Sequence, residues 1–141
     1  MEYNIDNDIK AAIDAGKAII NIYENESFDV EMKSDNSPLT KADKKAHEII
    51  MSYLDKTDIP VLSEEGKHMD YSERKGWSKF WLVDPLDGTK EFINRNGEFT
   101  VNIALIEDQK PIAGVIYVPV SKEIYLGIVN ESAWKVKTED S

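Results

Sequence analysis

The chain has 141 residues, of which 41% are hydrophobic, and this is enough for one domain with a real core. Its formal net charge of −10 argues against nucleic acid as a partner, because the phosphate backbone attracts basic surfaces. The absence of cysteine excludes disulfides, thiolate metal ligands and a cysteine nucleophile, and it fits a cytosolic protein. No apolar run is long enough to span a bilayer, and the N-terminus lacks the features of a signal peptide.

Two helices are expected in the first part of the chain. Apolar residues recur at helical spacing over residues 5–25 and again over residues 40–56. Between these helices, Phe28, Val30 and Met32 alternate with polar residues, which predicts a short strand or extended segment. A loop is expected over residues 34–38.

Two short apolar segments follow, and each leads into acidic residues. Residues 61–64 and 79–84 are predicted strands. Phe80 to Val83 form a run of four apolar residues, which suits a sheet that is covered on both faces. Pro85 is expected to end the second strand, because proline has no N–H to donate to a β-ladder.

The remainder predicts a helical turn and a series of short strands. The turn is expected over residues 90–95, and the strands are separated by turn residues at hairpin spacing. The strands are expected at residues 100–107, 112–117, 123–129 and 133–137. The predicted fold class is α+β, with two N-terminal helices packed on a mainly antiparallel sheet.

The most informative segment is residues 84–89, Asp-Pro-Leu-Asp-Gly-Thr. A turn after the strand would bring the carboxylates of Asp84 and Asp87 and the carbonyl of Leu86 within reach of one point. These are hard oxygen ligands, which Mg²⁺ prefers. Gly88 lets the backbone approach a ligand closely, and the amides of Gly88 and Thr89 can point at a phosphate.

An Asp-Gly turn of this kind is by itself structural more often than not. The segment Ser63-Glu64-Glu65 favours the metal site, because it ends a second short strand in carboxylates. Two strands that both end in acidic groups need a cation between them if the groups are to stay ionised.

Ser63-Glu64-Glu65 followed by residues 84–89 resembles the signature of the inositol monophosphatase-like phosphatases, which depend on Mg²⁺ and are inhibited by lithium. Lys90-Glu91-Phe92 is more similar to the 3′(2′),5′-bisphosphate nucleotidase branch than to the inositol branch. The similarity covers almost the whole chain and implies the N-terminal half of the layered fold of inositol monophosphatases and fructose-1,6-bisphosphatases. It also implies hydrolysis of 3′-phosphoadenosine 5′-phosphate to AMP and phosphate, with inositol or sugar phosphates as the alternative substrates.

The resemblance implies roles for the acidic residues. Asp84 would bridge two Mg²⁺ ions, the Leu86 carbonyl and Glu64 would complete one of them, and Asp87 would serve the other. Glu64 would also contact the attacking water, while Glu65 is either an exposed neighbour or an acceptor behind the ligands. The expected contacts to a small phosphorylated substrate, a nucleoside bisphosphate, are Glu64, Leu86, Asp87, Gly88, Thr89 and Lys90.

Asp43 has two interpretations. Thr40-Lys41-Ala42-Asp43 fits a capping box, in which Asp43 accepts a hydrogen bond from the Thr40 backbone amide. The family resemblance instead implies that Asp43 and Thr89 together orient the attacking water. For Lys90, a contact to substrate phosphate and simple balancing of nearby acidic charge are equally supported.

Family members carry a second domain with a Trp-Asp motif, whose aspartate is a further metal ligand. Nothing after Asp87 resembles that motif. Residues 1–141 are therefore expected to be an N-terminal metal-binding α+β domain, without the C-terminal domain and with little phosphatase activity alone. The alternative from another class is a non-catalytic fragment that binds Mg²⁺ weakly or self-associates through an exposed sheet.

Overall fold

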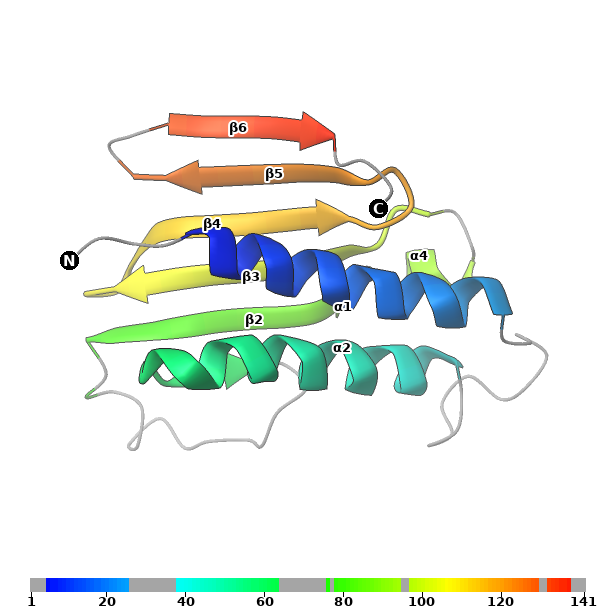
Figure 1. The fold of residues 1–141 in the computed structure, drawn as a ribbon, viewed down its shortest axis with the longest axis horizontal. Helices are drawn as coiled ribbons and strands as arrows, with labels where there is room; N and C mark the ends of the chain where they lie inside the picture. The colour runs from blue at the N-terminus through cyan, green and yellow to red at the C-terminus, as the bar shows by residue number, and fades with distance from the viewer. Residues whose placement is uncertain are drawn as a thin grey trace.

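The computed structural model describes residues 5–25, 38–63, 76, 78–94, 97–129 and 132–137. Helices α1 (Ile5–Asn25) and α2 (Pro38–Leu54) lie side by side on one face of a six-stranded sheet (Figure 1). The strands lie in sequence order, with β1 and β2 parallel and every other pair antiparallel. The strands are β1 (Val61–Ser63), β2 (Lys79–Asp87), β3 (Thr100–Glu107), β4 (Lys110–Val118), β5 (Glu123–Ile128) and β6 (Ser132–Lys137). The α+β prediction is confirmed.

The two helices pack through small and aliphatic side chains. Ala11, Ala15 and Ile19 of α1 are fully buried, as are Ala46 and Ile50 of α2. These positions recur every three to four residues, so each helix presents one apolar stripe to the core. Small side chains let α1, α2 and the sheet approach closely. The apolar stripe on each helix is the spacing from which the sequence predicted both helices.

Helix α2 begins earlier than expected. It starts at Pro38, and proline is favoured at the first helical position because its missing N–H would have no intrahelical acceptor there. Thr40 therefore lies inside the first turn and does not precede the helix, so the capping-box interpretation of Thr40 and Asp43 is wrong. The predicted end is replaced by a 3₁₀ turn, η1 (Asp55–Thr57), followed by Asp58 in a left-handed conformation.

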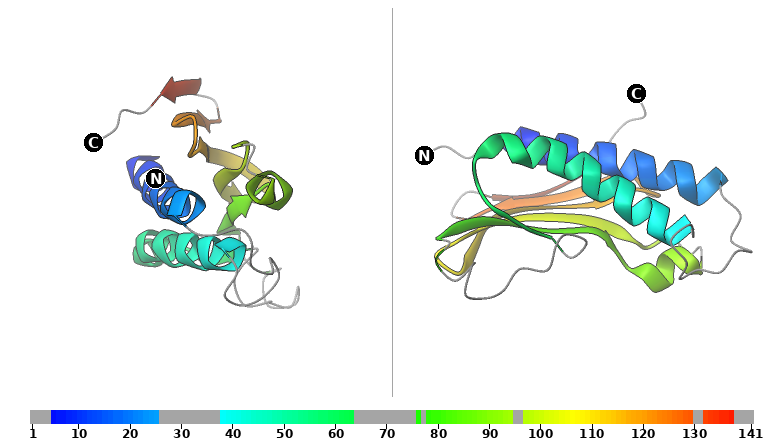
Figure 2. Two further views of the ribbon diagram at one scale, coloured as in Figure 1. Left: turned by 90° about the vertical axis from the view of Figure 1, so that its right-hand side faces the viewer. Right: turned by 90° about the horizontal axis from the view of Figure 1, so that it is seen from below.

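The helices cover only one face of the sheet. Side chains on this inner face are buried, including Val83 and Ile103 at 0% and 1% exposure. Figure 2 shows both helices on the same side, and no described helix lies against the opposite, outer face. Leu82 on the outer face is 39% exposed, so the prediction of a strand covered on both faces does not hold for the described residues.

Strand β2 is longer than expected. The prediction that Pro85 ends it was wrong, because β2 continues to Asp87. The register with β3 shifts between Asp84 and Asp87, so Pro85 and Leu86 fall where the ladder is interrupted. A proline at such an irregularity removes no ladder hydrogen bond, which is why it is tolerated here.

The other predicted strands agree with the structure to within two residues, and β3 has the predicted bounds. The expected helical turn is a five-residue helix, α4 (Thr89–Ile93). The extended segment expected at residues 28–32 lies outside the described residues, as does most of the loop expected at 34–38. Among the described residues, no helix has both the length and the apolar character needed to cross a membrane.

Candidate metal and phosphate site

The candidate site lies where the parallel strand β1 ends beside β2, which continues for four more residues. Ser63, the last residue of β1, pairs with Val83 of β2. Each of these residues is followed in the chain by an acidic residue, Glu64 after Ser63 and Asp84 after Val83. Glu64 and Glu65 lie outside the described residues, so their predicted roles are not tested by the structure.

The segment from Asp84 to Asp87 alternates between the surface and the core. Pro85 is buried and Leu86 is only 3% exposed, whereas Asp84 is half-buried and Asp87 is exposed. The two apolar side chains therefore anchor the irregular end of β2, while the carboxylates keep access to solvent. Both carboxylates lie where the sequence analysis expected a cation, and their role as metal ligands stays a prediction.

Asn102 is a site residue that the sequence analysis missed. It pairs with Asp84 in the β2–β3 register, and its Nδ2 atom donates a hydrogen bond of 3.0 Å to Oδ2 of Asp87. The bond ties the Asp87 carboxylate to β3, at the residue that pairs with Asp84. The available signal was an amide residue within the otherwise apolar run Val101–Ile106, but only the tertiary structure shows which carboxylate it contacts.

Gly88 turns the chain sharply into α4. Its φ is +92°, and a Cβ atom there would lie 3.2 Å from the Phe99 Cα atom. Both the left-handed backbone and the crowding exclude larger residues, so this glycine is required by the local fold. Thr89 then begins α4, and the side chains of Thr89 and Lys90 are exposed next to Asp87 in the chain.

An aromatic cluster holds α4 in place. The ring centroids of Tyr23, Phe92 and Phe99 lie 4.9 to 5.4 Å apart in tilted or edge-on arrangements. Phe92 and Phe99 are fully buried. Because such rings pack specifically, the cluster ties the end of α1 to the turn that carries Gly88 and Thr89.

Helix α2 approaches the same region from the inner face. It contacts both β2 and α4, and it carries Asp43, which is half-buried with its Oδ1 atom shielded from solvent. One helical turn later, Nδ1 of His47 lies 3.0 Å from Oγ of Ser63, at hydrogen-bond distance. This contact joins α2 to the end of β1, and the sequence analysis did not predict it.

The predicted residues thus lie on three neighbouring elements. Asp43 is on α2, the segment from Asp84 to Asp87 ends β2, and Thr89 and Lys90 are in α4. Among the described residues, no three histidine, aspartate or glutamate side chains lie close enough to hold a metal ion together. The predicted ligand set includes Glu64, which is not among those residues.

This combination of fold and strand-end carboxylates defines a class of protein. The sequence model of the inositol monophosphatase family matches residues 1–139, and the chain belongs to that family.

Within the family, the chain is similar to proteins named CysQ. It is 52% identical over 134 residues to the 3′(2′),5′-bisphosphate nucleotidase CysQ of Shigella flexneri, covering 93% of this chain and 54% of that protein. It superposes with a TM-score of 0.89 and 56% identity on the crystal structure of CysQ from Bacteroides thetaiotaomicron, covering 94% of this chain and 48% of that one. The 2′AMP-bound structure of SaIMPase-II is more distant, with a TM-score of 0.70 and 28% identity, over 91% of this chain and 46% of that one. The chain therefore spans about half the length of these relatives.

Proposed function

We propose that this chain provides the metal- and phosphate-binding half of a magnesium-dependent phosphomonoesterase. The proposed reaction is hydrolysis of 3′-phosphoadenosine 5′-phosphate to AMP and phosphate. The observation that carries the proposal is the end of β2, where Asp84 and Asp87 flank a buried Leu86 beside the end of the parallel strand β1. Similarity to CysQ proteins supports the choice of substrate.

The donor set fits Mg²⁺. Carboxylates and a backbone carbonyl are hard oxygen ligands, and the chain has no cysteine to favour a softer metal. The hydrogen bond from Asn102 to Asp87 resembles the outer contacts that orient metal-binding carboxylates. We assign Asp84, the Leu86 carbonyl, Asp87 and Glu64 as the residues that hold two or more Mg²⁺ ions.

Bound Mg²⁺ would neutralise phosphate charge and lower the pKa of a coordinated water. The protein's own groups then position the reactants. Asp43 and Thr89 orient the attacking water, with the Thr89 hydroxyl and the Asp43 carboxylate acting as a relay for its proton. The contact between α2 and α4 supports this pairing.

The remaining groups bind the phosphate. The backbone amides of Gly88 and Thr89 and the ammonium group of Lys90 supply positive potential, which this acidic chain needs in order to attract an anion. Phosphoryl transfer depends mainly on such positioning and charge stabilisation.

We assign the activity to the cytoplasm.

A chimaera tests the proposal. Residues 1–139 would replace the matched half of B. thetaiotaomicron CysQ, and phosphate release from 3′-phosphoadenosine 5′-phosphate would be measured with Mg²⁺. Asp84→Asn should lower kcat/KM by about 10²-fold or more, as expected for a preorganised charge-stabilising group. Asp55→Asn is the matched control, because Asp55 is an exposed residue of η1.

Two outcomes would contradict the proposal. Equal activity of the Asp84→Asn and Asp55→Asn chimaeras would remove Asp84 from the site. Faster hydrolysis of inositol 1-phosphate than of 3′-phosphoadenosine 5′-phosphate would favour the inositol phosphatase alternative. The 141-residue chain alone is expected to release little phosphate in the same assay.

A further inference from the structure

The side chains of His47 and Ser63 meet between a helix and a strand. Nδ1 of His47 lies 3.0 Å from Oγ of Ser63, and both residues are half-buried. They are 16 positions apart in the chain and belong to α2 and β1. A hydroxyl both donates and accepts, so it can complement Nδ1 with or without a proton. The contact is therefore a hydrogen bond between α2 and β1 in either tautomer of the imidazole.

Strand β1 depends on such a contact more than the other strands do. It has three residues and lies at the edge of the sheet, so β2 is its one neighbouring strand. A short edge strand has few ladder hydrogen bonds, and segments with few contacts open most easily. Because Ser63 is the last residue of β1, the bond from His47 fixes the end of the strand that lies nearest the candidate site.

Helix α2 carries Asp43 one turn before His47. Residues four positions apart lie on the same face of an α-helix. Asp43 is half-buried with its Oδ1 atom shielded from solvent, and α2 contacts α4, the helix that begins at Thr89. The face of α2 that reaches β1 is therefore also the face that carries the proposed water-orienting carboxylate.

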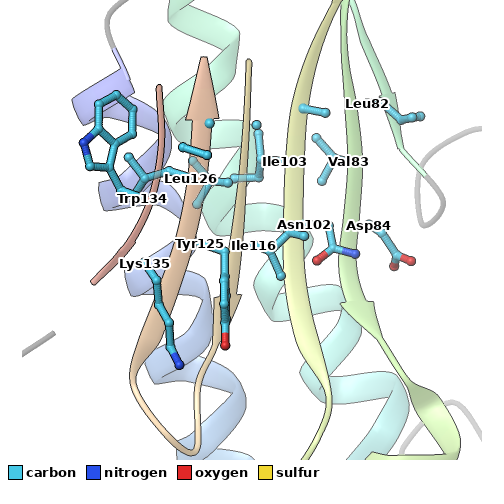
Figure 3. A pocket seen from close by; sticks show the side chains of 15 residues that line it. Leu82, Val83, Asp84, Asn102, Ile103, Ile116, Tyr125, Leu126, Trp134 and Lys135 are labelled. Carbon is cyan, nitrogen blue, oxygen red and sulfur yellow. The ribbon is translucent and has the colours of Figure 1, made fainter. Parts of the chain in front are cut away.

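The strand end that receives this bond lies beside the candidate metal ligands. Ser63 pairs with Val83 of β2, and Asp84 follows Val83 in the chain. Figure 3 shows the side chain of Asp84 next to that of Asn102 on β3. The hydrogen bond thus joins α2 to the pair of strands that presents the candidate ligand.

We propose that His47 is a positioning residue for phosphate ester hydrolysis. Through Ser63 it holds α2 at a fixed distance from the ends of β1 and β2, and it thereby sets Asp43 relative to Asp84. This role rests on the proposed function, because it takes Asp43 to orient the attacking water. His47 itself contacts neither phosphate nor metal. A displacement of about 1 Å in a positioned group can lower a rate about 10²-fold, so the bond should affect turnover more than substrate binding.

A second hydrogen bond between side chains provides an internal comparison. Nε1 of Trp81 donates to Oγ1 of Thr57 over 2.9 Å and joins η1 to β2. Thr57 follows the C-terminal end of α2, whereas Asp43 lies in the N-terminal half of that helix. Loss of either bond should lower stability. Only loss of the bond from His47 should also lower turnover.

Removing each partner in the chimaera tests the proposal, with phosphate release from 3′-phosphoadenosine 5′-phosphate measured in Mg²⁺. His47→Leu and Ser63→Ala should each lower kcat about tenfold and change KM less than about twofold, because the phosphate-binding groups are retained. The double variant should lose no more than either single variant, since all three lack the same bond.

Asparagine at position 47 is the matched rescue. Asparagine and leucine have the same branching, but the amide of asparagine places a polar atom on Cγ, where His47 carries Nδ1. His47→Asn should therefore retain most of kcat. Thr57→Val is the control for stability alone, and it should lower Tm without lowering kcat.

Thermal unfolding of the 141-residue chain gives a readout that is independent of catalysis. His47→Leu and Ser63→Ala should lower Tm, and their effects should not add in the double variant. His47→Asn should lower Tm less than His47→Leu. If His47→Leu does not fold, Ser63→Ala decides the question, because it removes the same bond by a smaller change.

An unchanged kcat in Ser63→Ala or His47→Leu would overturn the proposal, since the bond would then serve stability alone. So would additive losses in the double variant, or an equal loss of kcat in Thr57→Val. Failure of the proposed function is distinguishable from these results, because only that function predicts a loss in Asp84→Asn relative to Asp55→Asn.

Discussion

The two faces of the sheet are built from the same strands but differ in what covers them. On the inner face, Val83 and Ile103 are buried beneath α1 and α2, and on the outer face Leu82 and Ile116 remain exposed. Both faces are apolar, so composition alone does not distinguish them. The comparison shows that burial in this chain depends on what packs against an apolar face, and in the described chain α1 and α2 pack against the inner face.

The largest expected difference comes from truncating one isoleucine on each face. Ile103→Ala should lower the free energy of unfolding by about 2–4 kcal/mol, because it leaves a cavity in packed core. Ile116→Ala should cost less than about 1 kcal/mol, since Ile116 is already 45% exposed. Urea denaturation of both variants measures the contrast, and equal losses would contradict the one-sided core.

Asp8 provides a second test of the buried core on the inner face, because it is a polar residue within that core. It is fully buried, neither carboxylate oxygen has a hydrogen-bond partner among the described residues, and burial raises its pKa to about 8. The folded state keeps this group protonated where the unfolded chain ionises. Its contribution is therefore most favourable below pH 3.8 and is lost as pH rises towards 8.

Asp8→Ala should accordingly raise the free energy of unfolding at pH 7 by about 1–3 kcal/mol. The gain should shrink as pH falls towards 4, and this pH dependence separates it from the better helix propensity of alanine. Denaturation curves at pH 5, 7 and 8 would measure it. Asp55→Ala, at an exposed position, provides the control and should show no such trend.

Asn102 is a polar residue on the outer face. Asn102→Ala removes the hydrogen bond to Asp87, and in the chimaera it should weaken Mg²⁺ binding about tenfold, as is usual for contacts that orient metal ligands. Ala104→Ser changes the same face of the same strand without touching Asp87 and should leave the affinity unchanged. Calorimetric titration decides between them. An unaltered affinity for Asn102→Ala would show that the hydrogen bond does not orient a ligand.

The smallest effect is expected at the outer edge. Lys135 and Glu123 form an exposed ion pair of 3.0 Å between β5 and β6. The hydrogen bond from Lys135 holds the pKa of Glu123 below its usual value, so any stabilisation is present near neutral pH and is lost as pH falls through that lowered pKa. Lys135→Ala should leave the urea midpoint at pH 7 unchanged, because exposed pairs contribute little. A clear drop would indicate that β6 is held by this pair.

Periodicity and residue chemistry located most of the elements. The apolar spacing over residues 5–25 gave the bounds of α1, and the run Thr100–Glu107 gave those of β3. Two element boundaries were predicted wrongly, at Pro85 and at the start of α2, where an interrupted ladder and a proline at the first helical position decided the outcome. The first depends on the register with β3, which the segment around Pro85 does not reveal, whereas Pro38 is a local signal for a helix start that the sequence analysis did not use.

For the candidate site too, some features follow from the sequence and others only from the tertiary structure. The sequence by itself identified the candidate oxygen ligands, because Asp84, Leu86 and Asp87 lie close together in the chain and carry the family signature. Only the tertiary structure decided how they are supported, since Asn102 reaches Asp87 across 15 residues and His47 reaches Ser63 across 16. Contacts between separate elements depend on strand register and helix placement, and the exposure of the outer face depends on which face the two helices cover. Local spacing along the chain specifies neither.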